Sequence, residues 1–163
     1  MEIINQNRIN TLHPKVREEV TKIINECDLI LTGRAKIRIA QALRTEKEQN
    51  DLYAQGRTKP GKKVTNAKFG QSFHCFGLAV DFVLIIDGKE ASWDMTKDWD
   101  GDHTNHWQEI VNVYVKYGWE WGGNLISLKD FPHFQKVFGY TWQQLLMKHS
   151  KNDFIPGTQF VNI

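Results

Sequence analysis

The chain has 163 residues, of which 40% are hydrophobic and 25% charged, and its formal net charge is +2. This composition is ordinary for one soluble globular domain, so we expect a single domain over residues 1–163 that works as a monomer. The lysines and arginines are interspersed rather than clustered, which gives no reason to expect a nucleic-acid partner, and two cysteines are too few for a disulfide framework.

Residues 1–8 lack the basic start, the apolar run and the small-residue cleavage site of a secretory signal. No apolar run in the chain approaches the length that crosses a membrane. We therefore expect synthesis in the cytosol and no insertion into a membrane.

The first predicted helix covers His13–Leu31, where apolar residues recur at helical spacing with polar residues between them. The next segment, Ile37–Arg44, alternates like a strand. Thr45 and Glu48 then form a capping box, which predicts a second helix that runs to about Tyr53.

From Arg57 to Gly70 the chain is rich in Lys, Thr, Gly, Pro and Asn, which predicts a long exposed loop. Loops of this length inside a compact domain are often functional. Leu78–Ile86 is nearly all apolar, and Asp87-Gly88 after it is a hairpin turn signal. We expect a central strand here.

An acidic loop, Asp94–Asp102, precedes a predicted helix over His103–Tyr117. A short strand is expected around His133–Gln135 and a last short helix over Thr141–Lys148. Helices and strands mix without βαβ regularity, which indicates an α+β fold with a mainly antiparallel sheet.

Asp81 is the single charged residue in the apolar strand. A buried carboxylate without a partner would cost several kcal/mol or stay protonated, so an arginine, a lysine or a metal ion must meet it. From this residue alone, a structural ion pair is a simpler interpretation than a metal site.

His74 lies just before the strand, in the pattern S-x-H-x-x-G-x-A-x-D, and Gly77 allows the chain to bend between them. A loop histidine and a strand carboxylate at this separation can face one site. A lone histidine is more often a hydrogen-bonded imidazole than a ligand, so a metal site needs a third residue.

That third residue is His133, on a short apolar strand, with Asp130 three positions before it. Two histidines and one aspartate form a ligand set that leaves the fourth position of zinc open for water. Asp130 would be free to take the proton from that water. We predict one catalytic Zn²⁺ bound by His74, Asp81 and His133, with Asp130 as the general base.

Together these patterns resemble the zinc peptidase family that includes the D-Ala-D-Ala carboxypeptidases and dipeptidases and shares its fold with the Hedgehog signalling domain. The match is best for its phage-endolysin branch, the L-alanyl-D-glutamate endopeptidases. Five motifs carry the resemblance in this order: Tyr53–Thr58, Ser72–His74, Gly77–Phe82, Trp121–Gly123 and Asp130–Gln135. They imply a small mainly antiparallel sheet with flanking helices, a motif-bearing core over about 12–138, and a short C-terminal helix and tail over 139–163.

The resemblance implies the same zinc ligands and the same base. It also implies that Arg44, with Gln49 behind it, stabilises the tetrahedral oxyanion, and that Ser72 supports a metal ligand. Arg57 and the loop after it would hold the acidic substrate peptide. Taken without the family pattern, Arg44 would bind a substrate carboxylate or form a surface ion pair, and Arg57 would be solvated. Related carboxypeptidases and dipeptidases often carry Glu in place of Asp130, which fits the endopeptidase branch.

The implied activity is hydrolysis of the L-Ala-D-Glu bond in peptidoglycan stem peptides, by a bacteriophage endolysin or a related wall hydrolase. One alternative is a D,D-carboxypeptidase or dipeptidase that acts on D-Ala-D-Ala ends. Another is a non-catalytic, zinc-stabilised wall-binding module. An endolysin without a signal would stay in the cytoplasm of the producing cell and reach the wall after release through a holin or by lysis.

A rival cluster lies in Asp98–His106, which holds three acids and two histidines at helical spacing. We expect a turn in which Asp102 caps the next helix and the histidines lie on its exposed first turns. The alternative is a second site that binds calcium, although the run lacks the full twelve-residue pattern of a calcium loop.

Overall fold

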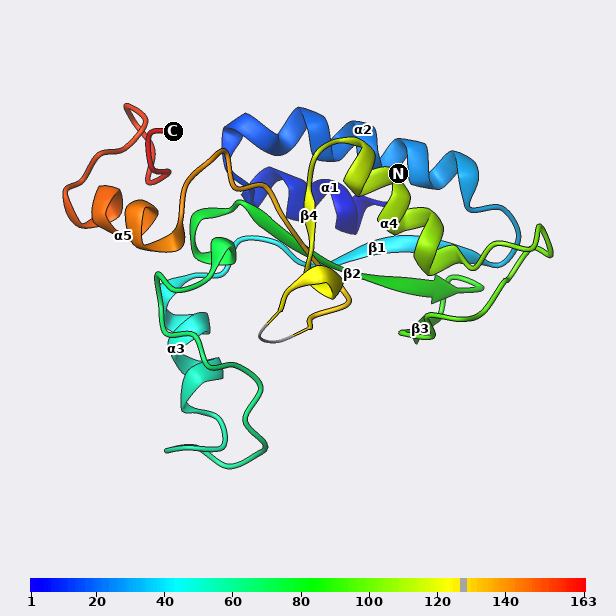
Figure 1. Cartoon of the computed structure of the whole chain (residues 1–163), viewed down its shortest axis with the longest axis horizontal. Helices are drawn as coiled ribbons and strands as arrows, with labels where there is room; N and C mark the ends of the chain where they lie inside the picture. Colours follow the sequence, from blue (N-terminus) through cyan, green and yellow to red (C-terminus); the bar gives the residue numbers. More distant parts are fainter. Residues whose placement is uncertain (127–128) are drawn as a thin grey trace.

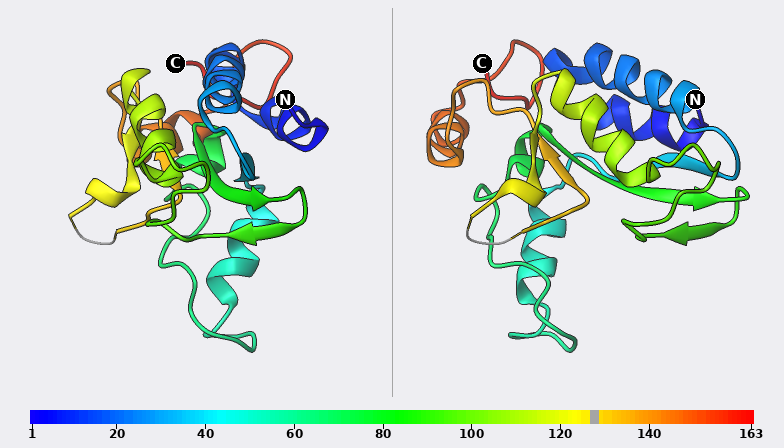
Figure 2. Two further views of the ribbon diagram at one scale, coloured as in Figure 1. Left: turned by 90° about the vertical axis from the view of Figure 1, so that its right-hand side faces the viewer. Right: turned by 45° about the vertical axis from the view of Figure 1, so that its right-hand side comes forward.

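A computed structural model describes residues 1–126 and 129–163. Three helices lie together on one face of an antiparallel sheet (Figures 1 and 2): α1 (Ile3–Thr11), α2 (Pro14–Ile30) and α4 (His106–Lys116). The helix α3 (Glu46–Ala54) extends from the opposite side, and α5 (Trp142–Ser150) lies at one end of the molecule (Figure 1).

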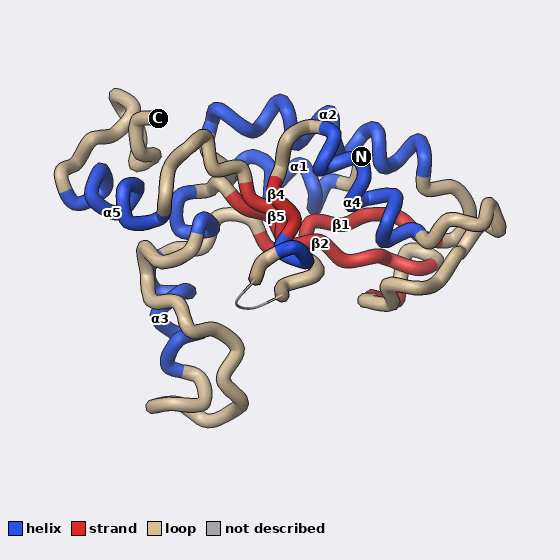
Figure 3. Tube along the Cα trace, in the orientation of Figure 1, coloured by secondary structure: helices blue, strands red, loops and turns tan. Residues whose placement is uncertain are grey.

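Every strand pairing among the described residues is antiparallel, and β2 is the central strand (Figure 3). The sheet order is β1-β2-β5-β4, and β3 pairs with β2 beside this path. The strand bounds are Ala35–Gln41 (β1), Ala79–Ile86 (β2), Glu90–Ser92 (β3), Glu120–Trp121 (β4) and His133–Gln135 (β5). The predicted α+β class, with a small mainly antiparallel sheet and flanking helices, is confirmed.

The hairpin that joins β2 to β3 is confirmed as well. The connection has three residues, Asp87, Gly88 and Lys89, between the paired Ile86 and Glu90. Asp87 and Gly88 have φ of 49° and 71°, and positive φ values at the turn match the twist of the strands it connects. The apolar side chains of β2 are buried, so Asp81 is left as a polar group within the sheet, directly opposite His133 of β5.

The predicted cap of α3 is present, and α5 has a cap of the same kind that was not predicted. The Thr45 side chain and Glu48 form a reciprocal capping box at the start of α3. Thr141 and Gln144 do the same for α5. Two short 3₁₀ turns complete the helical elements of the described ranges: η1 (Phe73–Phe76) and η2 (Gly122–Asn124).

The start of α4 differs from the prediction. The helix begins at His106 instead of His103, and the capping side chain is Asn105 rather than Asp102. His103 has a φ of 75°, and this left-handed backbone cannot be part of a right-handed helix. Asp102 instead accepts a hydrogen bond from the Thr104 backbone within the preceding turn.

The segment after α5 folds back onto the N-terminal helices. Val161 is 1% exposed, and its carbonyl accepts a hydrogen bond of 2.9 Å from His13 Nε2. Phe154 and Val161 also form an isolated antiparallel bridge. The predicted irregular tail therefore contributes to the core of the molecule.

Aromatic rings from the sheet and from α4 fill the centre of that core. The Tyr114 and Phe134 rings stack with centroids 4.1 Å apart, and those of Phe82 and Trp107 lie 4.3 Å apart. Both cysteines, Cys27 and Cys75, are buried and free. None of the helices in the described ranges is both long enough and apolar enough to cross a membrane.

Candidate metal centre

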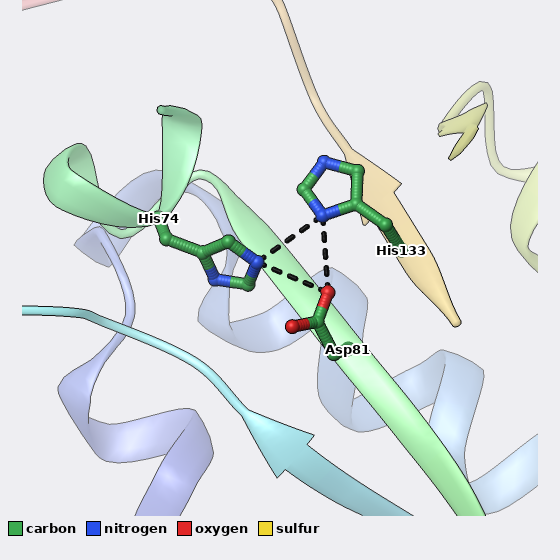
Figure 4. A group of neighbouring side chains, drawn as sticks. All are labelled: His74, Asp81 and His133. Atoms are coloured by element: carbon green, nitrogen blue, oxygen red, sulfur yellow. Dashed lines mark hydrogen bonds and ion pairs between the residues drawn. The ribbon is translucent and has the colours of Figure 1, made fainter. Parts of the chain in front are cut away.

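The structure brings His74, Asp81 and His133 to one point (Figure 4). His74 comes from η1, Asp81 from β2 and His133 from β5. The His74 Nε2 atom lies 3.1 Å from both Asp81 Oδ1 and His133 Nδ1, and the last two atoms are 3.0 Å apart. Two of the three positions are fixed by strand pairing, since Asp81 and His133 are register partners.

The third position depends on the turn that carries His74. The Ser72 hydroxyl accepts a hydrogen bond from the His74 backbone N–H and so caps η1. Gly77 ends the turn with a φ of 67°, and a Cβ there would lie 2.6 Å from His13 N. The serine and the glycine of the predicted pattern therefore hold His74 beside the start of β2.

Hydrogen bonds on the far side of each imidazole set its tautomer. His74 Nδ1 donates to the Ala42 carbonyl at 2.8 Å, which leaves a lone pair on Nε2. His133 Nε2 lies 3.1 Å from Gln135 Oε1, and the amide of Gln135 is oriented because its Nε2 donates to Glu120 at 2.9 Å. His133 therefore donates to Gln135 and keeps a lone pair on Nδ1.

Two imidazole lone pairs and a carboxylate oxygen thus face one another at 3.0–3.1 Å. Three acceptors repel unless positive charge lies between them. A proton satisfies one pair at a time, whereas a zinc ion with bonds of about 2.0–2.2 Å reaches all three. The residues present therefore fit a zinc ion.

The charges of the group are strongly coupled. Burial raises the pKa of the Asp81 carboxyl, but His74 and His133 outweigh burial and hold that pKa well below its usual range. Burial lowers the pKa of His133, and its contact with Asp81 more than reverses this, so the pKa is raised on balance. The carboxylate stays ionised, as a metal ligand must.

These atoms open into a cavity of about 260 Å³. Its lining comes from four elements and three loops: Arg44, Leu52, Val64, Thr65, Ser72, His74, Asp81, Asp130 and His133. A larger hollow of about 610 Å³ lies between α3 and the C-terminal tail and shares only Arg44 with it. We place the site in the smaller cavity because the ionisable groups converge there.

The family described as D-alanyl-D-alanine carboxypeptidase matches residues 65–136, a range that contains His74, Asp81, Asp130 and His133. The peptidoglycan L-alanyl-D-glutamate endopeptidase CwlK of Bacillus subtilis (strain 168) is 41% identical over 99 residues, which are 61% of this chain and 59% of CwlK. The chain is therefore similar to this peptidase family over the segment that carries the candidate site. It spans about three fifths of the length of the curated relative it matches.

A solved structure shares the fold. The Serratia marcescens L-Ala D-Glu endopeptidase ChiX aligns with a TM-score of 0.55 and 21% identity, over 85% of this chain and 90% of ChiX. The fold, and the resemblance to this peptidase family that the sequence motifs indicate, are thus confirmed. The roles of individual side chains in this chain stay predictions.

Arg44 lies at the edge of the centre. Its Nη2 is 3.7 Å from Asp81 Oδ2, longer than a hydrogen bond, while the other oxygen of Asp81 faces the histidines. Gln49 is fully buried, accepts a hydrogen bond from Arg44 Nη1 at 3.0 Å and donates to the Ala67 carbonyl. The predicted place of Gln49 behind Arg44 is therefore observed, and it aims the guanidinium into the cavity.

Asp130 lines the same cavity. Gly122 lets its backbone approach, because a Cβ on Gly122 would lie 2.2 Å from the Asp130 carbonyl oxygen and 3.0 Å from His133 Cβ. Burial and the negative charge of Asp81 both raise the pKa of Asp130. A raised pKa makes this carboxylate a better proton acceptor than an ordinary aspartate.

Arg57 is not among the residues that line the cavity. Its guanidinium donates to the carbonyls of Tyr53 and Thr65 and to Asn66 Oδ1, and it lies over the Tyr53 ring. These contacts hold the loop over 57–66 in shape. The predicted contact of Arg57 with the substrate stays a prediction.

Several residues of the site escaped the sequence-based predictions. Gln135 and Glu120 orient His133, and the Ala42 carbonyl orients His74. Gln135 could have been predicted from the sequence, because a residue two positions after a histidine in a strand lies on the same face as that histidine. The Ala42 carbonyl carries no such signal, because a backbone group is the same for every residue type.

Proposed function

We propose that the chain is a zinc peptidase that hydrolyses the L-Ala-D-Glu bond of peptidoglycan stem peptides. One observation carries the proposal: three lone-pair atoms 3.0–3.1 Å apart lie in a cavity that Asp130 and Arg44 also line. The family match supports a peptidase, and the activity in the name of CwlK supports this particular bond.

The residues that line the cavity have different roles in the proposed hydrolysis of the amide bond. Zinc, when bound by His74, Asp81 and His133, polarises the scissile carbonyl and makes water more acidic. The Asp130 carboxylate takes a proton from the attacking water and returns it to the nitrogen of the leaving amine. Arg44 supplies fixed positive charge toward the oxygen on which negative charge develops.

The surroundings of the cavity suit an acidic peptide. Val64 and Thr65 line it, and Lys62 and Lys63, immediately before them, are exposed. The stem peptide carries free carboxylates, and exposed lysines raise the local concentration of such a substrate. Arg57 contributes to this indirectly, because it fixes the loop that carries both lysines.

The test is a digest of purified peptidoglycan by the zinc-loaded protein, with the products analysed by mass spectrometry. We expect muropeptides with a new amine on D-Glu and L-Ala left on the glycan. Release of free D-Ala would instead identify a D,D-carboxypeptidase. Binding to the wall without any released peptide over a long incubation would identify a non-catalytic module.

We further propose that the enzyme acts as a bacteriophage endolysin, made in the cytoplasm and released to the wall through a holin or by lysis. The motif order described above supports this role. Expression together with a holin should lyse the host cell, and His133→Ala should abolish lysis at equal protein level. Lysis by both forms would contradict the role.

A further inference from the structure

A second group of ionisable side chains lies in the connection between β3 and α4. Asp98, Asp100 and His106 offer ligand atoms that all lie within 4.8 Å of one another. The connection packs beside the turn between α2 and β1, at the opposite end of the molecule from α5 (Figure 1). The peptidase site described above uses none of these residues.

Two carboxylates, one in this group and one beside His106, are buried without a full set of partners. The Asp100 side chain is 7% exposed, and its Oδ1 has no hydrogen-bond partner among the described residues. The Glu109 side chain is 10% exposed, and its Oε2 likewise has none in residues 1–126 and 129–163. A buried, unpaired carboxylate oxygen is costly, so each one indicates a missing positive partner.

His106 makes this lack of positive charge more acute. Its ring is fully buried, and Nε2 donates to the Thr32 carbonyl at 3.3 Å, which leaves a lone pair on Nδ1. That nitrogen accepts a long hydrogen bond, 3.5 Å, from the Trp99 backbone N–H and lies 3.4 Å from Glu109 Oε2. A neutral His106 therefore offers no proton to the Glu109 carboxylate. The expectation of exposed histidines at the start of α4 is wrong for His106.

The spacing of the acids follows a known pattern. Counted from Asp98, the acids Asp98, Asp100, Asp102 and Glu109 occupy positions 1, 3, 5 and 12, which are ligand positions of a twelve-residue calcium loop. The glycine of that pattern belongs at position 6, and His103 stands there with a φ of 75°. The full spacing is therefore present once Glu109 is included, and His103 adopts the backbone that glycine normally supplies.

The loop already holds Asp98 in a fixed orientation. Asp98 Oδ1 accepts hydrogen bonds from the backbone of Asp100 and Gly101, and Oδ2 accepts one from His103 at 3.0 Å. The guanidinium of Arg34 lies over Trp99 next to the loop but bonds to Asp87. It therefore does not supply the charge that the buried oxygens need.

We propose that the segment Asp98–Glu109 binds a calcium ion through the carboxylates of Asp98, Asp100 and Glu109. Calcium fits because oxygen donors dominate the group, and position 9 of such a loop, here His106, often acts through water. The ion would tie the start of α4 to the α2–β1 turn, where the Thr32 hydroxyl donates to Asp100. The expected consequence is a more stable fold rather than new chemistry.

The test measures the melting temperature of the full-length, zinc-loaded protein as CaCl₂ is added. At calcium about 100 times its dissociation constant, we expect a rise of about 5–10 °C. Asp100→Asn and Glu109→Gln should lose this rise. In calcium-free buffer they should melt no lower than the parent, because each removes a repelling charge. Asp94→Asn is the matched control, since Asp94 lies in the same connection and its side chain accepts hydrogen bonds from Thr96 and Lys97.

A second measurement uses terbium, whose luminescence is excited through nearby tryptophans such as Trp99. We expect terbium emission that calcium displaces in the parent protein and that is absent in Glu109→Gln. Displacement by Mn²⁺ but not by Ca²⁺ would overturn the calcium assignment in favour of a metal that binds the imidazole. A melting temperature unchanged by calcium would show that a proton on His106 balances the carboxylates, and the proposal would fail.

Discussion

Gln135 sets which nitrogen of His133 faces the metal centre. Its Oε1 accepts the proton of His133 Nε2, and Glu120 in turn fixes the amide. We predict that Gln135→Leu weakens zinc binding by about 10- to 100-fold, because the imidazole loses the bond that selects its tautomer. Competition with a chromogenic chelator measures this change.

Two control variants test whether the effect comes from the loss of the acceptor for His133 Nε2 or from any change at this place. Gln135→Glu keeps an oxygen at the same place and should retain most of the zinc affinity. Glu120→Gln also keeps an acceptor for Gln135 and should have a small effect. Equal zinc affinity in Gln135→Leu and the parent would show that the His133 tautomer does not depend on this bond.

Asp130 and His133 lie three residues apart in sequence, but we expect their substitution by alanine to have different effects on zinc binding and turnover. We predict that Asp130→Ala keeps zinc and lowers the turnover of purified wall by about 10²- to 10⁴-fold, the usual contribution of a general base. His133→Ala should lose both zinc and turnover. Metal analysis by mass spectrometry and release of soluble wall peptides give the two readouts. Full activity in Asp130→Ala would remove it from the mechanism.

Arg44 touches no predicted ligand at hydrogen-bond distance, so its removal should spare the metal. We predict that Arg44→Met lowers kcat by about 10²- to 10³-fold with little change in zinc content, as expected for a group that stabilises developing charge. A rise in KM alone would instead indicate that Arg44 binds a substrate carboxylate. Loss of zinc would indicate that its main role is to orient Asp81.

At the scale of elements, the approach of η2 to the segment before β5 shapes the site. A Cβ on Gly122 would meet the Asp130 carbonyl oxygen at 2.2 Å, so the strand that carries His133 would have to move. We predict that Gly122→Ala destabilises the fold by about 1–3 kcal/mol and lowers activity at least tenfold. Urea unfolding and wall turnover measure the two effects.

Gly139 offers the control for that substitution. It has a φ of 78°, and a Cβ there would meet nothing within 4 Å. Gly139→Ala should therefore cost only backbone strain, about 1 kcal/mol, and leave the activity unchanged. If both alanine variants lose activity to the same extent, close approach at Gly122 is not what matters.

Sequence patterns predicted the elements whose signals are local. The helix of Pro14–Ile30 has a regular apolar stripe, and the hairpin after β2 has its turn residues in place. The helix α1 went unpredicted because only Asn5 and Ile9 of it are buried. Asn5 bonds through its side chain to the backbone of Ile37 and Ile39 in β1, and a contact this distant leaves no periodic pattern.

The same contrast holds for the site. His74, Asp81 and His133 could be predicted because each interrupts an apolar or glycine-rich context with a residue type that binds zinc. The structural role of Arg57 could not, since its partners are the backbone carbonyls of its own loop and one asparagine. In the segment Asp98–His106 a calcium site was only the alternative prediction. That segment ends before Glu109, which stands at position 12 of the calcium-loop pattern counted from Asp98.

At the scale of the whole molecule, the C-terminal tail packs against the N-terminal part of the chain. Val161 is buried at 1% exposure, and Lys15 donates to the Ile163 carbonyl at 2.8 Å. His13 connects this tail to the centre, since its ring bonds to Val161 and its backbone N–H donates to the Gly77 carbonyl at 2.9 Å. The tail therefore supports the turn that carries His74.

We predict that Val161→Ala lowers the free energy of unfolding by about 2 kcal/mol, as expected when a well-packed core side chain is truncated. The unfolding should remain a single transition, because tail, helices and sheet share one core. Zinc affinity should be kept, since the substitution leaves the Val161 carbonyl that bonds to His13. Val115→Ala, at a position that is 49% exposed, is the matched control and should change stability little. If Val161→Ala leaves the urea midpoint unchanged, or if the tail unfolds in a separate transition, the expectation of a single domain over residues 1–163 is wrong.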